Sequence, residues 1–411
     1  MIGIAQRLTG LIGIAVLLGL AIATSRDRRR IPWRTVAWGL GLQAGFAVLI
    51  LKTAPGRAVF QAAAAVFRQI IAFTEAGTSF LFGDMATEYN AFRMLPVLIF
   101  FASLMGVLYH LGVMQKVVAG MAWLMRRTMG LSGAEALSAS GNVFVGMTEA
   151  PLLIRPYVAS LTESELMAVM TGGLATVAGS VMAAYVGMLK GESGGHLLCA
   201  SVMSAPAAVV IAKIMIPETE APQTAGAVEV SHERTTRNVI DAAAAGAGDG
   251  LRLALNVGAM LIAFLALIAM VNFGLGWGHD LAERWLGFAY FPSSLQEIFG
   301  VVLRPLAWVM GVPWRDADAV GSLMGIKIAA NEWIAYARLA KLQAELAPKS
   351  KTIAMYALCG FANFGSIGIL LGGIGGLAPQ RRGDLARLSL RALAGGAMAS
   401  FLTACIAGIL L

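Results

Sequence analysis

The chain has 411 residues, of which 58% are hydrophobic and only 13% are charged. Soluble domains carry about 25% charged residues, so this composition excludes an ordinary soluble protein and indicates an integral membrane protein. The net charge of +8 comes from short basic clusters between apolar runs. Such clusters are typical of the loops that orient membrane spans, so we expect no nucleic-acid partner. Cys199, Cys359 and Cys405 are widely spaced in apolar segments, and this spacing predicts neither a disulfide nor a structural zinc site.

The first third of the chain predicts three spans and one interfacial helix. The runs at 8–25, 35–51 and 92–114 are apolar and of spanning length. Residues 54–82 alternate apolar and polar side chains at helical spacing, which predicts an amphipathic helix in the membrane interface. Because Arg26–Arg30 follows the first run, we expect a retained first helix with its N-terminus outside and the arginines in the cytoplasm.

A polar stretch at 141–156 interrupts the apolar pattern. It is apolar enough for membrane depth, yet it carries the carboxylate of Glu149, two glycines and two prolines, which prevent one uninterrupted helix. A carboxylate in hydrocarbon is costly and normally faces a cavity, a partner or a substrate. Irregular backbone at this depth is tolerated only where protein or a water-filled cavity covers it. The alternative interpretation is a short polar loop between two spans.

The remaining elements follow the same logic. We expect an interrupted span at 166–189, a span at 196–216, a cytoplasmic linker at 217–250, a span at 251–275, interfacial helices at 277–314, a second unusual stretch at 325–336, an interrupted span at 352–377 and a final span at 388–411. The basic residues at 116–127 and at 381–387 are predicted to lie in cytoplasmic loops, like the linker. Eight spans then also place the C-terminus outside. This count requires both unusual stretches to be re-entrant hairpins.

The two unusual stretches occupy equivalent places in the chain. Glu149 is followed after 27 residues by Thr176 in a glycine-broken span, and Glu332 is followed after 31 residues by Asn363 in another. Three spans separate the two hairpins, so they begin on opposite sides of the membrane. The sequence therefore predicts an all-α membrane protein with an inverted repeat, which in secondary transporters forms a midplane site from interrupted helices.

Three motifs carry a family resemblance. Gly146–Pro151, Gly325–Trp333 and Cys359–Ser366 resemble motifs of the concentrative nucleoside transporters, in the family's order and spacing. The resemblance covers nearly the whole chain and implies the bacterial form: eight transmembrane helices, two hairpins, an interfacial helix and a homotrimer in the cell inner membrane. It also implies an elevator-type symporter, with a scaffold at 1–131 and 217–315 and transport halves at 132–216 and 316–411.

The resemblance further implies the substrate-binding residues. These are Met147, Thr148, Glu149, Val181, Glu332, Phe361, Asn363 and Ser366. Thr148 and Glu149 would hold the nucleobase of a nucleoside, with Val181 as an apolar wall. Glu332, Asn363 and Ser366 would bind the ribose hydroxyls in a pocket lined by Phe361. Met147 departs from the family, because many members have a glutamine there, and a thioether is a weak acceptor. Base recognition is therefore expected to be looser.

The expected coupling ion is sodium. By resemblance its ligands are the side chains of Asn142 and Thr176 and the backbone carbonyls of Val145 and Val177. These ligands are neutral oxygens, which suit a monovalent cation, since divalent sites usually include carboxylates. A proton carried by Glu149 or Glu332 is the alternative.

The alternatives to a symporter are an enzyme and a passive channel or receptor. The carboxylates of Glu149 and Glu332 could serve an enzyme as acid and base, but the sequence has no nucleophile with a neighbouring base, metal cluster or phosphate loop beside them, so we expect no enzyme. A passive channel or receptor could use the same pocket. The structural alternative pairs these carboxylates with Arg155 and Lys327, and we expect Lys327 to tether its hairpin.

Overall fold

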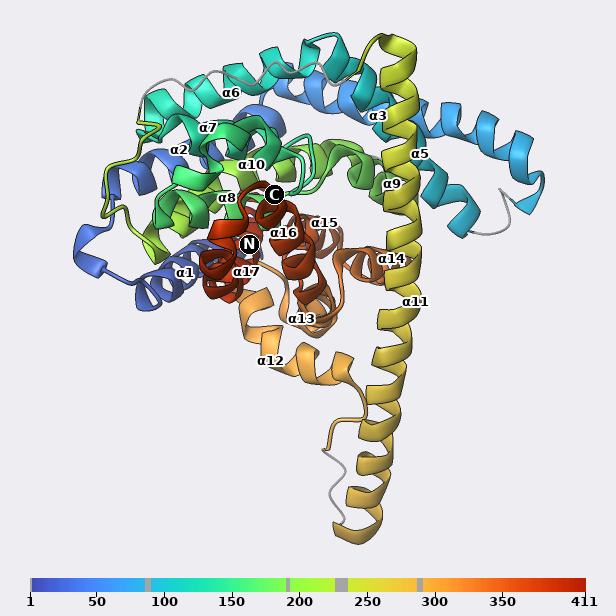
Figure 1. The fold of residues 1–411 in the computed structure, drawn as a ribbon. Coiled ribbons are helices and arrows are strands. Elements are labelled where there is room, and N and C mark those ends of the chain that lie inside the picture. The colour runs from blue at the N-terminus through green and yellow to red at the C-terminus, as the bar shows by residue number, and fades with distance from the viewer. Residues whose placement is uncertain (1, 86–89, 190–192, 226–235, 287–290) are drawn as a thin grey trace.

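The computed structural model describes residues 2–85, 90–189, 193–225, 236–286 and 291–411, and every regular element in these ranges is a helix (Figure 1). Among the described residues, five helices are long and apolar enough to cross a membrane, and the number rises to seven if each of two bent helix pairs counts as one span. The all-α class is confirmed, and the count of eight spans stays a prediction.

The N-terminal region contains α1 (Ile2–Ala23), α2 (Trp33–Lys52), α3 (Ala54–Phe82), α5 (Asn90–His110) and α6 (Val113–Met129). The helix predicted at 54–82 has those bounds. The prediction of a basic loop at 116–127 was wrong, because these residues belong to α6, which meets α5 at a bend of 78°. The helix forms because Met114, Val118, Met125 and Met129 give it one apolar side, which is buried.

The first unusual stretch folds back on itself as predicted. Helix α7 (Gly133–Gly141) and the 3-10 helix η2 (Ala150–Ser160) pack against each other and are joined by the irregular residues 142–149. Capping boxes at Ser132 with Glu135, and at Thr162 with Glu165, begin α7 and α8.

The helices that follow the first hairpin also match the prediction. They are α8 (Glu163–Ala175), α9 (Gly179–Leu189) and α10 (Ser193–Met215). The break between α8 and α9 lies at 176–178, within the expected interruption.

The linker predicted at 217–250 is only partly correct. Helix α11 (Val239–Leu286) is a single element of 48 residues that begins before and ends after the expected span. Its first turns are rich in alanine, a strong helix former, and they pack closely on α5. A Cβ on Gly250 would lie 2.6 Å from the Cα of Ile99. Figure 1 shows α11 running past the body of the protein, with its C-terminal part projecting beyond it.

The second hairpin and broken span repeat the first arrangement. Helix α12 (Leu295–Val309) leads into α13 (Trp314–Ala329), which turns at residues 330–331 into α14 (Glu332–Leu342). The broken span consists of α15 (Pro348–Leu358) and α16 (Phe364–Leu377), and α17 (Arg382–Leu410) ends the chain. The prediction of a loop at 381–387 was wrong, because residues 382–387 form the first turns of α17. The core lies where α8, α10 and α17 pack together, and α10 is buried along nearly its whole length.

Candidate solute and ion sites

The two broken helices touch at their breaks. The backbone N–H of Phe361 donates to the carbonyl of Thr176 at 3.2 Å. The approach is so close that a Cβ on Gly360, whose φ is +140°, would lie 2.7 Å from the carbonyl oxygen of Ala175 and from the Oγ of Ser400. Half-helix ends leave backbone groups unpaired, so this junction collects polar backbone in the interior of the protein.

The tip of the first hairpin lies against the same junction. The N–H of Gly179 donates to the carbonyl of Phe144 at 3.0 Å, and the hydroxyl of Ser201 donates to the carbonyl of Val143 at 3.0 Å. Within the tip, the N–H of Gly146 donates to Oε2 of Glu149 at 2.6 Å. These bonds fix an irregular backbone beside the start of α9.

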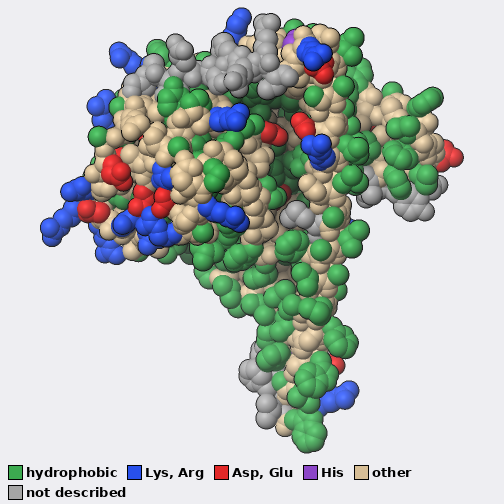
Figure 2. Space-filling model, viewed as in Figure 1, with side chains coloured by type: hydrophobic (Ala, Val, Ile, Leu, Met, Phe, Trp, Pro, Cys, Tyr) green, Lys and Arg blue, Asp and Glu red, His purple; other side chains and the backbone are tan. Residues whose placement is uncertain are grey.

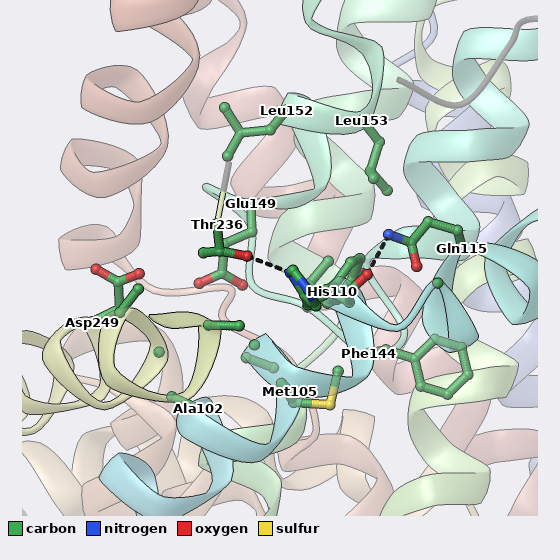
Figure 3. A pocket seen from close by; sticks show the side chains of 18 of the residues that line it. Ala102, Met105, His110, Gln115, Phe144, Glu149, Leu152, Leu153, Thr236 and Asp249 are labelled. Carbon is green, nitrogen blue, oxygen red and sulfur yellow. Dashed lines mark hydrogen bonds between the residues drawn. The ribbon is translucent and has the colours of Figure 1, made fainter. Parts of the chain in front are cut away.

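A cavity of about 650 Å³ opens beside this tip, between η2, α5, α6 and α11. Figure 2 shows a hollow next to α11 with acidic side chains at its edges. In the close-up of Figure 3, Glu149 from the hairpin and Asp249 from α11 both reach toward the cavity. At its other side, Nδ1 of His110 lies 2.7 Å from the hydroxyl of Thr236.

Glu332 is buried away from this cavity. Its Oε1 accepts a hydrogen bond from the hydroxyl of Tyr185 at 2.9 Å, and its Oε2 accepts one from Nδ2 of Asn363 at 2.8 Å. The ring of Tyr185 stacks on that of Tyr336, with centroids 4.3 Å apart. Asn363 also caps α16, because its Oδ1 accepts from the N–H of Ser366 at 2.8 Å.

The predicted substrate residues are therefore only partly brought together. Glu332, Asn363 and Ser366 form one connected group, as expected. Glu149 lines the cavity, whereas Glu332, Phe361, Asn363 and Ser366 are absent from the described residues that line it. The ion pairs of the structural alternative are absent too, since the described residues show neither Glu149 paired with Arg155 nor Glu332 with Lys327.

The hairpin tip packs between α8 and α16 through Met147 and Thr148. A Cβ on Gly173 of α8 would lie 2.7 Å from the Cβ of Met147, and one on Gly373 of α16 would lie 2.8 Å from Cγ2 of Thr148. Val181 is buried on α9. Glycine at both positions lets the tip approach closely, so Met147 contributes packing at this place.

One of the predicted ion ligands, Asn142, is a buried amide without a hydrogen-bond partner among the described residues. Asn142 is fully buried, and neither its Oδ1 nor its Nδ2 has a hydrogen-bond partner among the described residues. Its Nδ2 lies beside Gly172, in the last turn of α8, where a Cβ would be 3.3 Å away. The hydroxyl of Thr176 donates to the carbonyl of Gly172 at 2.9 Å, which leaves its oxygen free to accept or coordinate. A buried, unpaired amide oxygen fits a cation ligand.

The described residues include no group of three or more histidine, cysteine, aspartate or glutamate side chains placed to hold a metal.

Sequence reasoning missed two residues of this region, Tyr185 and Asp249. Tyr185 lies four residues after Val181 and so on the same helix face, which is the one signal that could have pointed to it.

Family models and similar proteins show which family the chain belongs to. Models described as Na+ dependent nucleoside transporter C-terminus and N-terminus match residues 196–408 and 12–85, and one described as nucleoside recognition matches 91–192. The chain belongs to the Na+ dependent nucleoside transporter family. Sodium/nucleoside cotransporter 1 of Rattus norvegicus is 44% identical over 98% of this chain, which spans 64% of the rat protein. An uncharacterized transporter of Haemophilus influenzae is 44% identical over 98% of this chain and 97% of its own length.

Solved structures of the family superpose closely on the chain. CNTnw in an inward-facing substrate-bound state has a TM-score of 0.91 and is 42% identical, with 98% of this chain and 97% of that chain covered. A doubly substituted variant of CNTnw in an outward-facing state has a TM-score of 0.90 at the same identity and coverage. The resemblance inferred from the three motifs is thus confirmed, and these relatives are transporters rather than enzymes.

Proposed function

We propose that the protein is a sodium-coupled symporter that imports nucleosides. The observation that carries the proposal is Asn142, a fully buried amide that has no hydrogen-bond partner among the described residues and lies beside the break at Thr176. A sodium ion coordinated there by Asn142, Thr176 and the carbonyls of Val145 and Val177 would give the amide oxygen of Asn142 a partner. Sodium would bind as a transported co-substrate, and the Na+ dependence in the family's description supports this choice over a proton.

The solute would bind where the hairpin tips meet the broken helices. Glu149, Met147, Thr148 and Val181 would contact the base from the first half of the repeat. Glu332, with Asn363 in hydrogen-bond contact and Ser366 beside it, supplies the acceptors and donors that suit two vicinal hydroxyls of a sugar, and Phe361 would close that side. Glu332 lies outside the cavity in this conformation. The side chains around Glu332 would therefore have to rearrange when the solute binds.

We further propose an elevator mechanism. The transport halves at 132–216 and 316–411 would move against the scaffold at 1–131 and 217–315. The cavity opens near the end of α5, the start of α6 and the first turns of α11, in the region that the basic residues predict to be cytoplasmic. The conformation would then be inward-open. Large exposed apolar side chains on α11 suit contact with lipid or with other subunits of a homotrimer in the inner membrane.

Uptake of radiolabelled uridine and adenosine into proteoliposomes tests the function. Sodium and pH gradients are imposed separately. Sodium-driven accumulation above the external concentration supports the symporter. Accumulation driven only by pH would identify proton coupling, and equilibration without accumulation would identify a passive channel.

A further inference from the structure

Lys327 is a buried cation without an acidic ion-pair partner among the described residues. It lies in the last turn of α13 and is fully buried. Its Nζ donates to the carbonyl of Ala357 at 2.9 Å and lies 5.6 Å from the centre of the Phe401 ring. An ammonium group removed from water is costly unless other groups compensate its charge, so this position requires an explanation.

The compensation comes from the end of a half-helix and from one carboxylate. Ala357 belongs to the last turn of α15, whose unpaired carbonyls carry a partial negative charge of about half an electron. Glu332 follows Lys327 by five residues and acts on it electrostatically without contact. The ammonium therefore binds the carbonyl end of α15, at the break before α16, in the way that a bound cation would.

The first half of the repeat has a similar contact between a hairpin and a half-helix end, and there the proposed sodium site lies. Asn142 directly follows α7, the first helix of its hairpin, and faces Gly172 in the last turn of α8. Lys327 ends α13, the first helix of the second hairpin, and faces Ala357 in the last turn of α15. Each half thus directs one polar side chain from the hairpin onto the end of the following half-helix.

Charge balance explains why each half of the repeat would need a cation. Each hairpin tip carries one carboxylate, Glu149 in the first half and Glu332 in the second. We propose that Lys327 is a built-in cation, which takes in the second half of the repeat the place that the coupling sodium takes in the first. The transport halves then carry one exchangeable cation, so one sodium moves with each solute. This inference rests on the proposed function.

A charge cycle tests the role of Lys327 without requiring transport. Lys327→Met, Lys327→Arg, Glu332→Gln and the double variant Lys327→Met with Glu332→Gln are purified, and thermal unfolding is followed without nucleoside in sodium and in choline. Lys327→Met should lower the Tm by roughly 5 °C or more, because it leaves a buried carboxylate uncompensated. Lys327→Arg, which keeps the charge, should lower it less. Adding Glu332→Gln to Lys327→Met should restore most of the loss.

Several outcomes would overturn the inference. Additive effects of the two substitutions would show that Lys327 only tethers Ala357. If Lys327→Met alone gives no folded protein, the double variant should fold, and its failure would contradict the proposal equally. A reversal-potential measurement on the wild type should give one sodium per nucleoside, and a ratio of two contradicts a built-in cation. By contrast, if sodium stabilises none of the proteins, the proposed coupling ion fails while the charge cycle still reports on Lys327.

Discussion

Phe361 and Thr176 join the two halves of the repeat through the backbone. The N–H of Phe361 donates to the carbonyl of Thr176 at 3.2 Å, so each broken helix meets the other where its own hydrogen-bond ladder stops. The proposed sodium ligand and the proposed sugar-binding residues stand on opposite sides of this bond.

Gly360→Ala should disrupt this junction. The φ of Gly360 is +140°, and an added Cβ would lie 2.7 Å from the carbonyl oxygen of Ala175 and the Oγ of Ser400. We expect a loss of roughly 2–4 kcal/mol of stability from combined strain and overpacking. Thermal unfolding of the purified variant measures the loss. Gly368→Ala is the matched control, because its added Cβ meets no atom within 4 Å. Equal effects of the two would show that the junction tolerates a side chain.

Thr176→Val should weaken sodium coupling. The substitution keeps the shape of the side chain but removes the hydroxyl that donates to the carbonyl of Gly172, the residue beside Asn142. The sodium concentration for half-maximal uptake should rise several-fold to a few hundredfold, as expected for the loss of a partner worth about 1–3 kcal/mol. Uptake at different sodium concentrations measures this. Wild-type uptake that ignores sodium but follows an imposed pH gradient would refute the assignment.

Glu332→Gln should change sugar recognition. The carboxylate accepts bonds from Tyr185 and Asn363 and has lone pairs left for hydroxyl protons. We expect ribonucleosides to bind several-fold to a few hundredfold more weakly, about 1–3 kcal/mol. The preference for ribo- over deoxyribonucleosides should flatten.

Equilibrium binding of uridine, deoxyuridine and adenosine reads out this change. Glu149→Gln is the comparison, since it should weaken all nucleosides and leave the sugar preference intact. An equal loss for every ligand in Glu332→Gln would mean that the sugar is read elsewhere.

Gly195→Ala should shift the conformational equilibrium. A Cβ on Gly195 of α10 would lie 2.6 Å from the ring of Phe60 on α3, a contact between the proposed transport and scaffold parts. The added methyl should disfavour this cavity-open conformation, and Phe60→Ala should relieve the clash. Labelling of Gln115→Cys, in the cavity, by an impermeant thiol reagent in inside-out vesicles reports the open population. Slower labelling in Gly195→Ala and recovery in the double variant are expected. Unchanged labelling in both would exclude this contact as a determinant of the state.

Most of the architecture could be predicted from the sequence, because the membrane imposes strong local rules. Apolar runs of spanning length marked the helices, and glycine, proline and buried polar residues marked the breaks. The helix at 54–82 and the interruption near Thr176 therefore lie where the residues placed them. The prediction was wrong where polar residues occur on helices that bury only one face, as in α6 and the first turns of α11, because charge alone does not distinguish a loop from an amphipathic helix.

Tertiary structure alone decided which side chains meet. Glu332 and Tyr185 are 147 residues apart, and nothing local in the sequence pairs a carboxylate of one half with a hydroxyl of the other. The same holds for Asp249 of α11, which reaches the cavity only because small residues let α5 and α11 pack closely. The sequence determined which groups are too polar to remain unpartnered in a membrane. Their partners depend on how distant helices pack, and packing is a property of the whole fold.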